Sequence, residues 1–387
     1  MTAPAQPGAG RQVRGAGVLA VDVGAGTTDI LLTRHGQPLE NAVKLVVPSA
    51  TQVAAARVAA ATARRQTVVF RGPVMGGGAV TQAMKAHVAA GLDFVATEEA
   101  AGTFADDVER VRAAGVRVVG EADADAALHT LPDDGVAAVP SGDLDPGALR
   151  RALALLGVEP AFDAVAVAVQ DHGFCPDGSN RVFRFALWEA AVAAAEPVGA
   201  LFHDAAAVPP ELTRLRAAAA VAILLAGDAP ALAGDTGPAA LYGALPERAA
   251  DALLVNVGNS HTVCLLALEG RVAGVFEHHT SCLDGPGLES RLLRWLAGDL
   301  AGEEVRADHG HGAVLAPDAA GAAFDGSGSG AGLRLPLVVT GPRRELLAGS
   351  ELPAEFAAPH GDMMLTGCFG LLRALRDRGA VPAAAPG

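Results

Sequence analysis

The stretch that decides the fold is Val18 to Leu32, VLAVDVGAGTTDILL. Two short apolar runs rich in valine, isoleucine and threonine flank a glycine turn, which predicts a β-hairpin. Glycine at the tip permits positive φ and close approach of a ligand, and successive N–H groups there can cradle phosphate oxygens. Asp22, on the strand entering the turn, is placed to hold Mg²⁺ directly or through water. The expected cofactor-binding residues of this tip are Gly24, Ala25, Gly26, Thr27 and Thr28.

Two common nucleotide motifs do not fit this turn. A Rossmann fingerprint needs a third glycine and then a helix, whereas a β-branched and apolar run follows Asp29. A P-loop needs Gly-Lys-Ser or Gly-Lys-Thr, and the chain has neither. The alternative that stays open is an ordinary glycine hairpin with no ligand.

The hairpin pattern returns at residues 253–272, LLVNVGNSHTVCLLALEGRV. Asn256 takes the place of Asp22 and Gly258 that of Gly24, each 234 positions later in the chain. One supersecondary unit used twice implies two related lobes. Two such turns facing each other would clamp the phosphates of one nucleotide. The second tip adds these cofactor-binding candidates: Gly258, Asn259, Ser260 and Thr262.

A glycine loop leads from a predicted strand at residues 67–70 into a helix at residues 79–90. Gly76, Gly77 and Gly78 would expose N–H groups at the positive end of that helix, which is typical of an anion or substrate site. The same glycines would also suit a close strand–helix crossing that has no room for side chains. Residues 120–147, rich in Asp, Pro and Gly, are expected to form a loop.

Polar residues follow the predicted strand at residues 164–169, AVAVAV. The carboxyl end of a buried strand is where α/β proteins place chemistry. Asp171 is the candidate general base or water-orienting group, and His172 is a candidate substrate contact beside it. The alternative is that these residues cap a turn.

Two histidines, His278 and His279, end a predicted strand. Neighbouring strand residues point to opposite faces, so the pair cannot easily bind one metal. We expect His278 to bind substrate and the other ring to pack. Residues 302–332, which include His309 and His311, are expected to form a mobile surface loop.

Composition narrows the class of protein. The chain is 51% hydrophobic but only 4% aromatic, and its net charge of −14 argues against a nucleic-acid or anionic-membrane partner. Four cysteines lie far apart without a CxxC pair, which argues against a zinc ribbon or a three-cysteine iron–sulfur loop. No signal-peptide core or bilayer-length apolar run is present. We expect a soluble, cytoplasmic protein.

These motifs resemble the actin, sugar kinase and heat-shock chaperone ATPase superfamily. Both phosphate turns match, and residues 337–341 (LVVTG) match its adenosine motif, which assigns Gly341 to nucleotide binding. The resemblance implies an α/β fold of two ribonuclease H-like lobes with a nucleotide cleft between them, and ATP with Mg²⁺ as cofactors. Two departures are Asn256, in place of the usual acid, and Pro342, in place of the usual second glycine.

More closely, the chain resembles the DUF1786 family, whose label is pyruvate formate-lyase activating enzyme. The markers are VDVGAGTTDIL, VMGGG, ATEEAAGT, QDHG and EHHT. The resemblance covers about Gly17 to Leu375. The expected divisions are a disordered tail (1–16), lobe I (17–165), lobe II (166–364), a C-terminal connecting helix (365–379) and a second tail (380–387).

The function expected from these patterns is ATP-dependent phosphoryl transfer to, or processing of, an unknown small molecule. An ATP-hydrolysing switch that activates a partner enzyme is the first alternative. A catalytically weak nucleotide-binding protein is the second, and Asn256 favours it. An activator that holds an iron–sulfur cluster across a homodimer would need exposed cysteines, for which Cys175 and Cys282 are the candidates.

Overall fold

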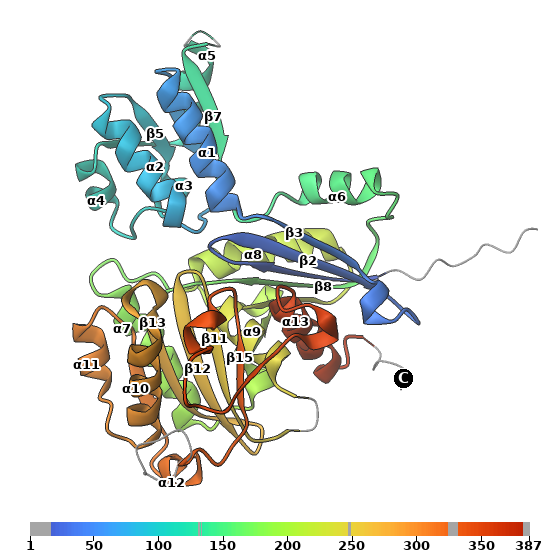
Figure 1. The fold of residues 1–387 in the computed structure, drawn as a ribbon. Helices are drawn as coiled ribbons and strands as arrows, with labels where there is room; N and C mark the ends of the chain where they lie inside the picture. The colour runs from blue at the N-terminus through green and yellow to red at the C-terminus, as the bar shows by residue number, and fades with distance from the viewer. Residues whose placement is uncertain (1–16, 131, 133, 247–248, 324–331, 382–387) are drawn as a thin grey trace, which may run out of the picture.

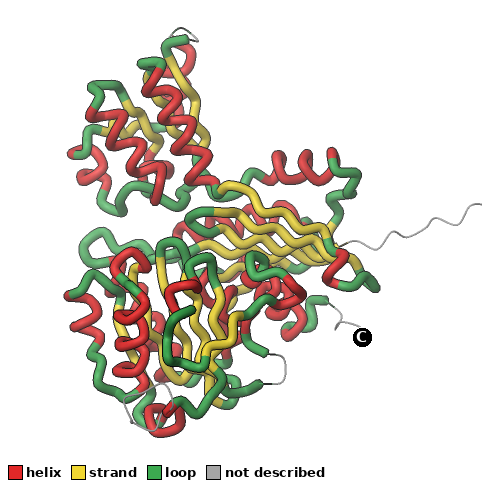
Figure 2. The backbone as a smooth tube through the Cα atoms, in the orientation of Figure 1, coloured by secondary structure: helices red, strands yellow, loops and turns green. Residues whose placement is uncertain are grey.

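The computed structural model describes residues 17–130, 132, 134–246, 249–323 and 332–381. The expected tail at residues 1–16, most of the tail at 380–387 and most of GSGSGAG lie outside the described residues. Three sheets follow one another in space (Figures 1 and 2). Helices cover their faces, as expected for an α/β protein. No helix among the described residues is long and apolar enough to cross a membrane.

The first sheet is built on the opening hairpin. Its first three strands are antiparallel neighbours, and a later strand, β8, runs parallel to the first. In β8 alanines face one side and valines the other, so the sheet is buried on both faces. The strands in spatial order are β3 (Val43–Pro48), β2 (Thr27–Arg34), β1 (Gly17–Val23), β8 (Phe162–Val169), β10 (Ala231–Gly234) and β9 (Phe202–Asp204).

The second sheet repeats this topology. Three antiparallel strands are again followed by a strand parallel to the first of them. The predicted reuse of one supersecondary unit is therefore confirmed at the level of strand order. The strands in spatial order are β14 (Gly312–Leu315), β13 (Arg271–His279), β12 (His261–Leu268), β11 (Ala252–Val257), β15 (Leu337–Thr340) and β16 (Ala354–Phe356).

Two helices, α9 (Thr236–Ala244) and α13 (Thr366–Asp377), lie between the two sheets (Figure 1). They cross where both carry glycine. A Cβ atom at Gly243 would lie 1.9 Å from the Thr366 carbonyl oxygen, and one at Gly370 would lie 1.9 Å from the Ala239 carbonyl oxygen. The alanine face of the first sheet leaves room for this pair. A helix near the C-terminus was predicted, and α13 is that helix.

The other helices of the two hairpin sheets lie on their outer faces, except α7 and α11, which lie next to β13 and β14. Apolar residues of α8 and α6 pack on the outer face of the first sheet, and those of α10 and α12 pack on the second. Short 3-10 helices lie at residues 39–41, 198–201, 205–207, 280–282, 344–347 and 359–361. The helix bounds are α6 (Pro146–Leu155), α7 (Asn180–Ala193), α8 (Thr213–Ala226), α10 (Gly285–Leu296), α11 (Gly302–Ala307) and α12 (Ala319–Ala323).

The expectation of a mobile loop over residues 302–332 is wrong for its described part. Residues 302–323 form α11, β14 and α12. Gly302 begins α11 and Gly312 begins β14, and Val305 and Ala319 are buried in the second core. Residues 324–331 lie outside the described residues.

A third, parallel sheet forms a unit that projects from the first sheet (Figure 1). It has its own apolar core and is inserted after β3. The sequence did not separate it from lobe I, and the expected loop at residues 120–147 contains α5 and β7. The strands in spatial order are β6 (Val116–Val119), β5 (Phe94–Thr97), β4 (Thr67–Arg71) and β7 (Val136–Pro140). The helices are α1 (Ala50–Ala63), α2 (Gly78–Ala89), α3 (Glu98–Ala101), α4 (Val108–Ala113) and α5 (Glu121–Thr130).

Candidate functional site

The two hairpin tips close in the same way. The Gly24 N–H donates a hydrogen bond to the Thr27 carbonyl oxygen at 2.9 Å. The Gly258 N–H donates to the His261 carbonyl oxygen, also at 2.9 Å. The residues that make these bonds keep the 234-position offset of the sequence repeat. The tips are therefore two copies of one backbone turn.

The tips meet at one crevice. A Cβ atom at Gly26 would lie 2.6 Å from Nδ2 of Asn259, so the two turns are in contact. A cavity of about 100 Å³ lies at this contact and reaches the end of β15. The predicted cofactor-binding residues that line it are Gly24, Ala25, Thr27, Gly258, Asn259, Ser260 and Gly341.

Three predicted cofactor-binding residues do not line the crevice: Gly26, which lies at the contact between the tips, and Thr28 and Thr262. Thr28 is 5% exposed and is paired within the first sheet. Thr262 is fully buried, and its hydroxyl shares a hydrogen bond with the Thr280 hydroxyl at 3.0 Å. Both side chains belong to the packing of their sheets. Backbone groups, with Thr27 and Ser260, are what the tips present to the crevice.

Asp22 lies directly across the hairpin from Asp29. Both side chains are buried, and Oδ1 of each has no hydrogen-bond partner. Burial, followed by the negative charge of Asp29, raises the pKa of Asp22 from 3.8 to about 8. Burial raises the pKa of Asp29 from 3.8 to about 7, and the charge of Asp362 adds to this. Two buried carboxyl groups with unpaired oxygens form a site that lacks positive charge.

This acid pair fits Mg²⁺, the cation that the resemblance implies. Magnesium prefers carboxylate oxygens, is commonly bound by one or two of them, and completes its shell with water and phosphate. Asp22 and Asp29 would hold it beside the first tip, and both line the crevice. A bound cation supplies the charge that would keep both groups ionised. Asp22 was predicted as the metal ligand, and Asp29 was not singled out.

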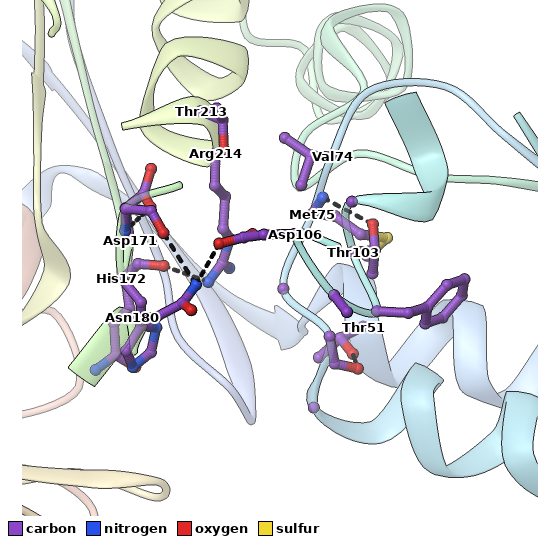
Figure 3. A pocket seen from close by; sticks show the side chains of 18 of the residues that line it. Thr51, Val74, Met75, Thr103, Asp106, Asp171, His172, Asn180, Thr213 and Arg214 are labelled. Atoms are coloured by element: carbon purple, nitrogen blue, oxygen red, sulfur yellow. Dashed lines mark hydrogen bonds between the residues drawn. The ribbon is translucent and has the colours of Figure 1, made fainter. Parts of the chain in front are cut away.

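A larger cavity of about 490 Å³ adjoins the crevice (Figure 3). Gly24, Ala25 and Ser260 line both spaces, so the hairpin tips separate the two. The projecting unit forms the opposite wall of the larger cavity. The predicted substrate-site residues that line it are Gly76, Gly77, Gly78, Asp171 and His172.

Asp171 is held by backbone hydrogen bonds at the end of β8. Its Oδ1 accepts from the Gly173 N–H and its Oδ2 from the Leu215 N–H, both at 2.7 Å. The second bond ties Asp171 to the first turn of α8. Burial raises the pKa of Asp171, while these two backbone donors oppose the rise. Asp171 therefore caps a turn, as the alternative interpretation expected. Each carboxylate oxygen can still accept one further hydrogen bond, from a substrate.

The glycine loop is packed tightly against its surroundings. A Cβ atom at Gly76 would lie 2.6 Å from the Arg214 guanidinium, and one at Gly77 would lie 2.6 Å from the Thr103 carbonyl oxygen. The Gly76 N–H donates to Oδ1 of Asp143 at 3.2 Å. These contacts leave no room for side chains, as expected from the interpretation of the glycines as a close strand–helix crossing. The loop also lines the cavity.

Polar contacts join the projecting unit to the rest of the cavity wall. Arg214 of α8 binds both carboxylate oxygens of Asp143, which follows β7, at 2.7 and 2.9 Å. Asn180, at the start of α7, donates to Oδ2 of Asp106, which follows α3, at 2.6 Å (Figure 3). Substrate in this cavity would therefore touch both the hairpin layer and the projecting unit.

A buried guanidinium joins the two hairpin sheets. Arg184 of α7 donates to both oxygens of Glu277 on β13 at 2.9 Å, and to Oδ2 of Asp235 after β10 at 2.7 Å. Arg184 is 4% exposed and Glu277 is fully buried. Breaking such a pair leaves an uncompensated buried charge. The network fixes the two sheets relative to each other next to the crevice.

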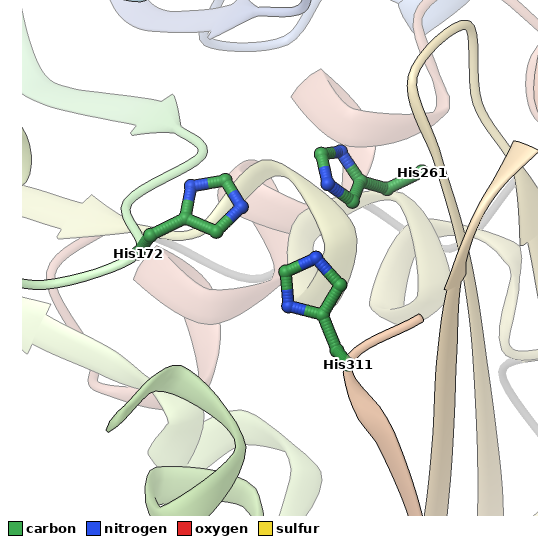
Figure 4. Close-up of side chains that lie close together, drawn as sticks. All are labelled: His172, His261 and His311. Atoms are coloured by element: carbon green, nitrogen blue, oxygen red, sulfur yellow. The ribbon is translucent and has the colours of Figure 1, made fainter. Parts of the chain in front are cut away.

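Three histidines from different elements converge beside this network (Figure 4). His172 follows β8, His261 begins β12 and His311 precedes β14. Their ring centroids are 5.0 to 5.2 Å apart. Burial, followed by the charge of Arg184, lowers the pKa of His172 well below 6.5 and that of His311 to about 2. Burial also lowers the pKa of His261, so all three rings are neutral.

Strand alternation turns His278 away from this cluster. His278 is fully buried, and its Nε2 lies 3.4 Å from Oδ2 of Asp308. It lines neither the crevice nor the larger cavity. Its neighbour His279 points to the opposite face, and its ring centroid lies 4.5 Å from that of His261. The expected opposite orientation is confirmed, and His279 is the ring next to the site.

The sequence also contains signals for two further residues of the crevice, Asp29 and His261. In a hairpin whose turn is centred between Ala25 and Gly26, Asp29 must pair with Asp22 across the strands. His261 stands at the offset position of Thr27 and so shares its place at a tip. His311 had no such signal. It precedes β14, and the pairing of β14 with β13 brings it to the site. The sequence around His311 does not reveal that pairing.

The candidate iron–sulfur cysteines are both free. Cys175 lines the larger cavity, and Cys282 is exposed in the segment after β13. Neither belongs to a cluster of metal-ligating side chains among the described residues.

Comparison with known proteins places the chain within a family. A family model described as "Putative pyruvate format-lyase activating enzyme (DUF1786)" matches residues 75–346. No curated protein matches the chain. The structure is similar to that of ethanolamine utilization protein EutJ from Carboxydothermus hydrogenoformans, with 12% identity, 92% of this chain and 88% of that chain covered, and a TM-score of 0.25. It is also similar to an exopolyphosphatase-like protein, with 12% identity, 84% and 66% covered, and a TM-score of 0.19. At these TM-scores neither similarity bears on the function.

Proposed function

The chain belongs to the DUF1786 family, and we propose that it binds ATP with Mg²⁺ between its two hairpin tips and transfers a phosphoryl group to a small molecule. The observation that carries the proposal is the shared crevice, lined by Gly24, Gly258 and Gly341. These three residues come from the two phosphate turns and the adenosine strand, which are far apart in the sequence. The two-lobed, actin-like arrangement of ribonuclease H-like lobes is part of this proposal.

In this proposal the triphosphate lies between the tips and is held by backbone N–H groups. Asp22 and Asp29 hold Mg²⁺, which neutralises charge on the phosphates. Phosphoryl transfer needs positioning and charge neutralisation more than covalent help. Because the tips touch, as the Gly26–Asn259 contact indicates, they must separate when the nucleotide enters.

The acceptor would occupy the larger cavity, next to the end of the triphosphate. Asp171 is the proposed base, since it lines that cavity and each oxygen has room for one more hydrogen bond. Arg214 would fix the wall of this cavity, because it donates to the Gln170 carbonyl oxygen next to Asp171 and to Asp143, which accepts from the Gly76 N–H of the glycine loop. The volume of about 490 Å³ suits a metabolite and excludes a protein chain from the inner wall.

Titration calorimetry tests the binding step. We expect one Mg·ATP per chain, and much weaker binding of ATP when Mg²⁺ is removed with a chelator. Steady-state turnover with a panel of small acids and sugars then tests transfer. Absence of nucleotide binding at millimolar ATP would overturn the proposal.

A second candidate is an ATP-driven switch that activates a partner enzyme. It is favoured by the family description as an activating enzyme and by the contacts between cleft and projecting unit, Arg214–Asp143 and Asn180–Asp106. Opening of the tips would reorient that unit. Turnover stimulated only by a protein, with no small-molecule acceptor, would favour this candidate.

A further inference from the structure

The three-histidine cluster has the composition of a transition-metal site. His172, His261 and His311 each offer a nitrogen, and these nitrogens all lie within 4.8 Å of one another. Among the described residues, these three side chains form the one group of at least three His, Cys, Asp or Glu side chains with the spacing to hold a metal ion. Imidazole suits zinc, copper, iron and nickel, whereas Mg²⁺ prefers oxygen ligands. The cluster is therefore distinct in chemistry from the Asp22–Asp29 pair.

The nitrogens of two rings lack any protein partner. Nδ1 and Nε2 of His261, and both nitrogens of His311, are buried without a hydrogen bond. His311 is fully buried. A buried polar group left unpaired destabilises the folded state. Four such nitrogens in one place indicate that a ligand belongs between the rings.

The backbone beneath the rings is fixed. The His311 N–H donates to the Glu277 carbonyl oxygen at 3.0 Å, and His261 is paired with His279 in the second sheet. His172 follows Asp171, whose own N–H donates to Asp235 at 3.1 Å. Tetrahedral zinc at its usual bond length sets ligand nitrogens about 3.4 Å apart, so rotation of the rings from this starting geometry would complete the site.

Charged groups of both signs lie around the rings. Glu277 and Asp235 are two carboxylates that share the guanidinium of Arg184, and the negative charge of Glu277 acts on His261. The positive charges that act on the rings are those of Arg184 and Arg181 on His311, and those of Arg184 and Arg214 on His172. Neutral imidazoles add no charge of their own, so a divalent ion is not opposed by its ligands.

We propose that His172, His261 and His311 bind a divalent first-row transition-metal ion with one coordination position open to the larger cavity. His172 and His261 line that cavity, while His311 closes the site from behind. Three histidines with an open position are the arrangement of catalytic zinc sites, where the metal binds water or a substrate oxygen. This inference does not depend on ATP binding.

The experiment uses the full chain without a histidine tag, stripped with a chelator and then titrated with Zn²⁺ or Co²⁺. We expect one tightly held ion per chain by elemental analysis after desalting. We also expect visible absorption bands from Co²⁺ in a site of low symmetry. H172A and H311A each remove a proposed metal ligand. Loss of an outer-sphere partner lowers metal affinity by roughly 10- to 100-fold, and we expect each of these variants to lose more than that.

The controls separate loss of a ligand from loss of fold. H35A removes an exposed histidine in the turn after β2 and should bind metal like the wild type. D22N should also keep the transition metal, because it alters the magnesium site only. H172Q, at a partly exposed loop residue, replaces H311A if the latter does not fold. H279A should leave the affinity within a fewfold, because His279 is not one of the three proposed ligands.

Two results would overturn the inference. One is the absence of a stoichiometric ion in the stripped and reloaded wild-type protein. The other is metal binding that is unchanged in folded H172A or H172Q, since an ion held elsewhere would not need that ring.

Discussion

The two hairpins share a backbone but differ in their charged side chains. Across the first hairpin Asp22 faces Asp29, and across the second Asn256 faces Val263. Both tips close through the same hydrogen bond from glycine. The repeat has therefore kept the turn that can bind phosphate in both halves, while the carboxylates occur only in the first.

This difference suggests a division of labour. The first hairpin would hold the cation and the second would supply backbone donors, together with His261 at the position equivalent to Thr27. An acid in the second hairpin is then unnecessary for binding. Substitutions in the two hairpins test this asymmetry, and their expected effects range from a large loss of affinity to a small one.

Asp22→Asn should remove most Mg²⁺-dependent ATP binding. The substitution keeps the shape of the side chain and removes a negative metal ligand, so we expect a loss of roughly 100-fold in Mg·ATP affinity by calorimetry. Asp163→Asn, at an exposed position on β8, is the matched control and should bind like the wild type. Equal affinities for D22N and D163N would contradict the assignment of the cation to the first hairpin.

The two tip glycines should respond differently to a methyl group. A Cβ atom at Gly258 would lie 2.7 Å from the His261 carbonyl oxygen, whereas one at Gly24 would lie 3.4 Å from the Thr27 carbonyl oxygen. We expect Gly258→Ala to lower the free energy of unfolding by about 1–3 kcal/mol, as overpacking does. Gly24→Ala should change it by less than about 0.5 kcal/mol. Urea unfolding of both variants measures this, and equal losses would show that the tips are not packed as described.

The acid pair should make the cation-free protein less stable as pH rises. Folding raises the pKa of Asp22 to about 8 and that of Asp29 to about 7, both from 3.8. Between about pH 4 and pH 8 the folded state binds more protons than the unfolded state, so stability falls as pH increases. The slope for one group is at most about 1.4 kcal/mol per pH unit.

Unfolding curves in chelator at several pH values test this linkage. Asp22→Asn should flatten the dependence and raise stability at pH 8, while Mg²⁺ should flatten it in the wild type. A stability that rises with pH over the same range in the wild type would contradict the burial of this pair.

Asn256→Asp should have the smallest effect. It adds an acid to the second hairpin, but Val263 stands opposite and supplies no second carboxylate. We expect Mg·ATP affinity to fall by only about two- to fivefold, through repulsion of the phosphates partly screened by salt. A large gain in affinity or turnover would show that the second hairpin is also a cation site.

Local patterns predicted the parts of the fold that repeat or alternate. The short β-branched runs around Gly24 and Gly258 gave both hairpins, and their constant offset gave the duplication of the sheets. The projecting unit was missed as a separate body because its alternating strands and helices look like the rest of an α/β chain. The sequence predicts a loop over residues 120–147, because α5 carries three acidic residues in its first five and lacks a strong apolar stripe.

The site was predicted only where one segment carries it. The tip residues and Asp22 were found because they are contiguous, and most of them line one crevice. The histidine cluster depends on three strand ends that meet only after both sheets have paired. No sequence spacing encodes such a meeting, and the expected loop around His311 hid one of its members.

Amide hydrogen exchange with and without Mg·ATP tests the central claim most directly. If one triphosphate is held from both sides, peptides covering residues 23–28 and 257–262 should gain protection together, over the same range of nucleotide concentration. Protection of one tip alone, or of neither while ATP is bound, would contradict the clamp between the two hairpins.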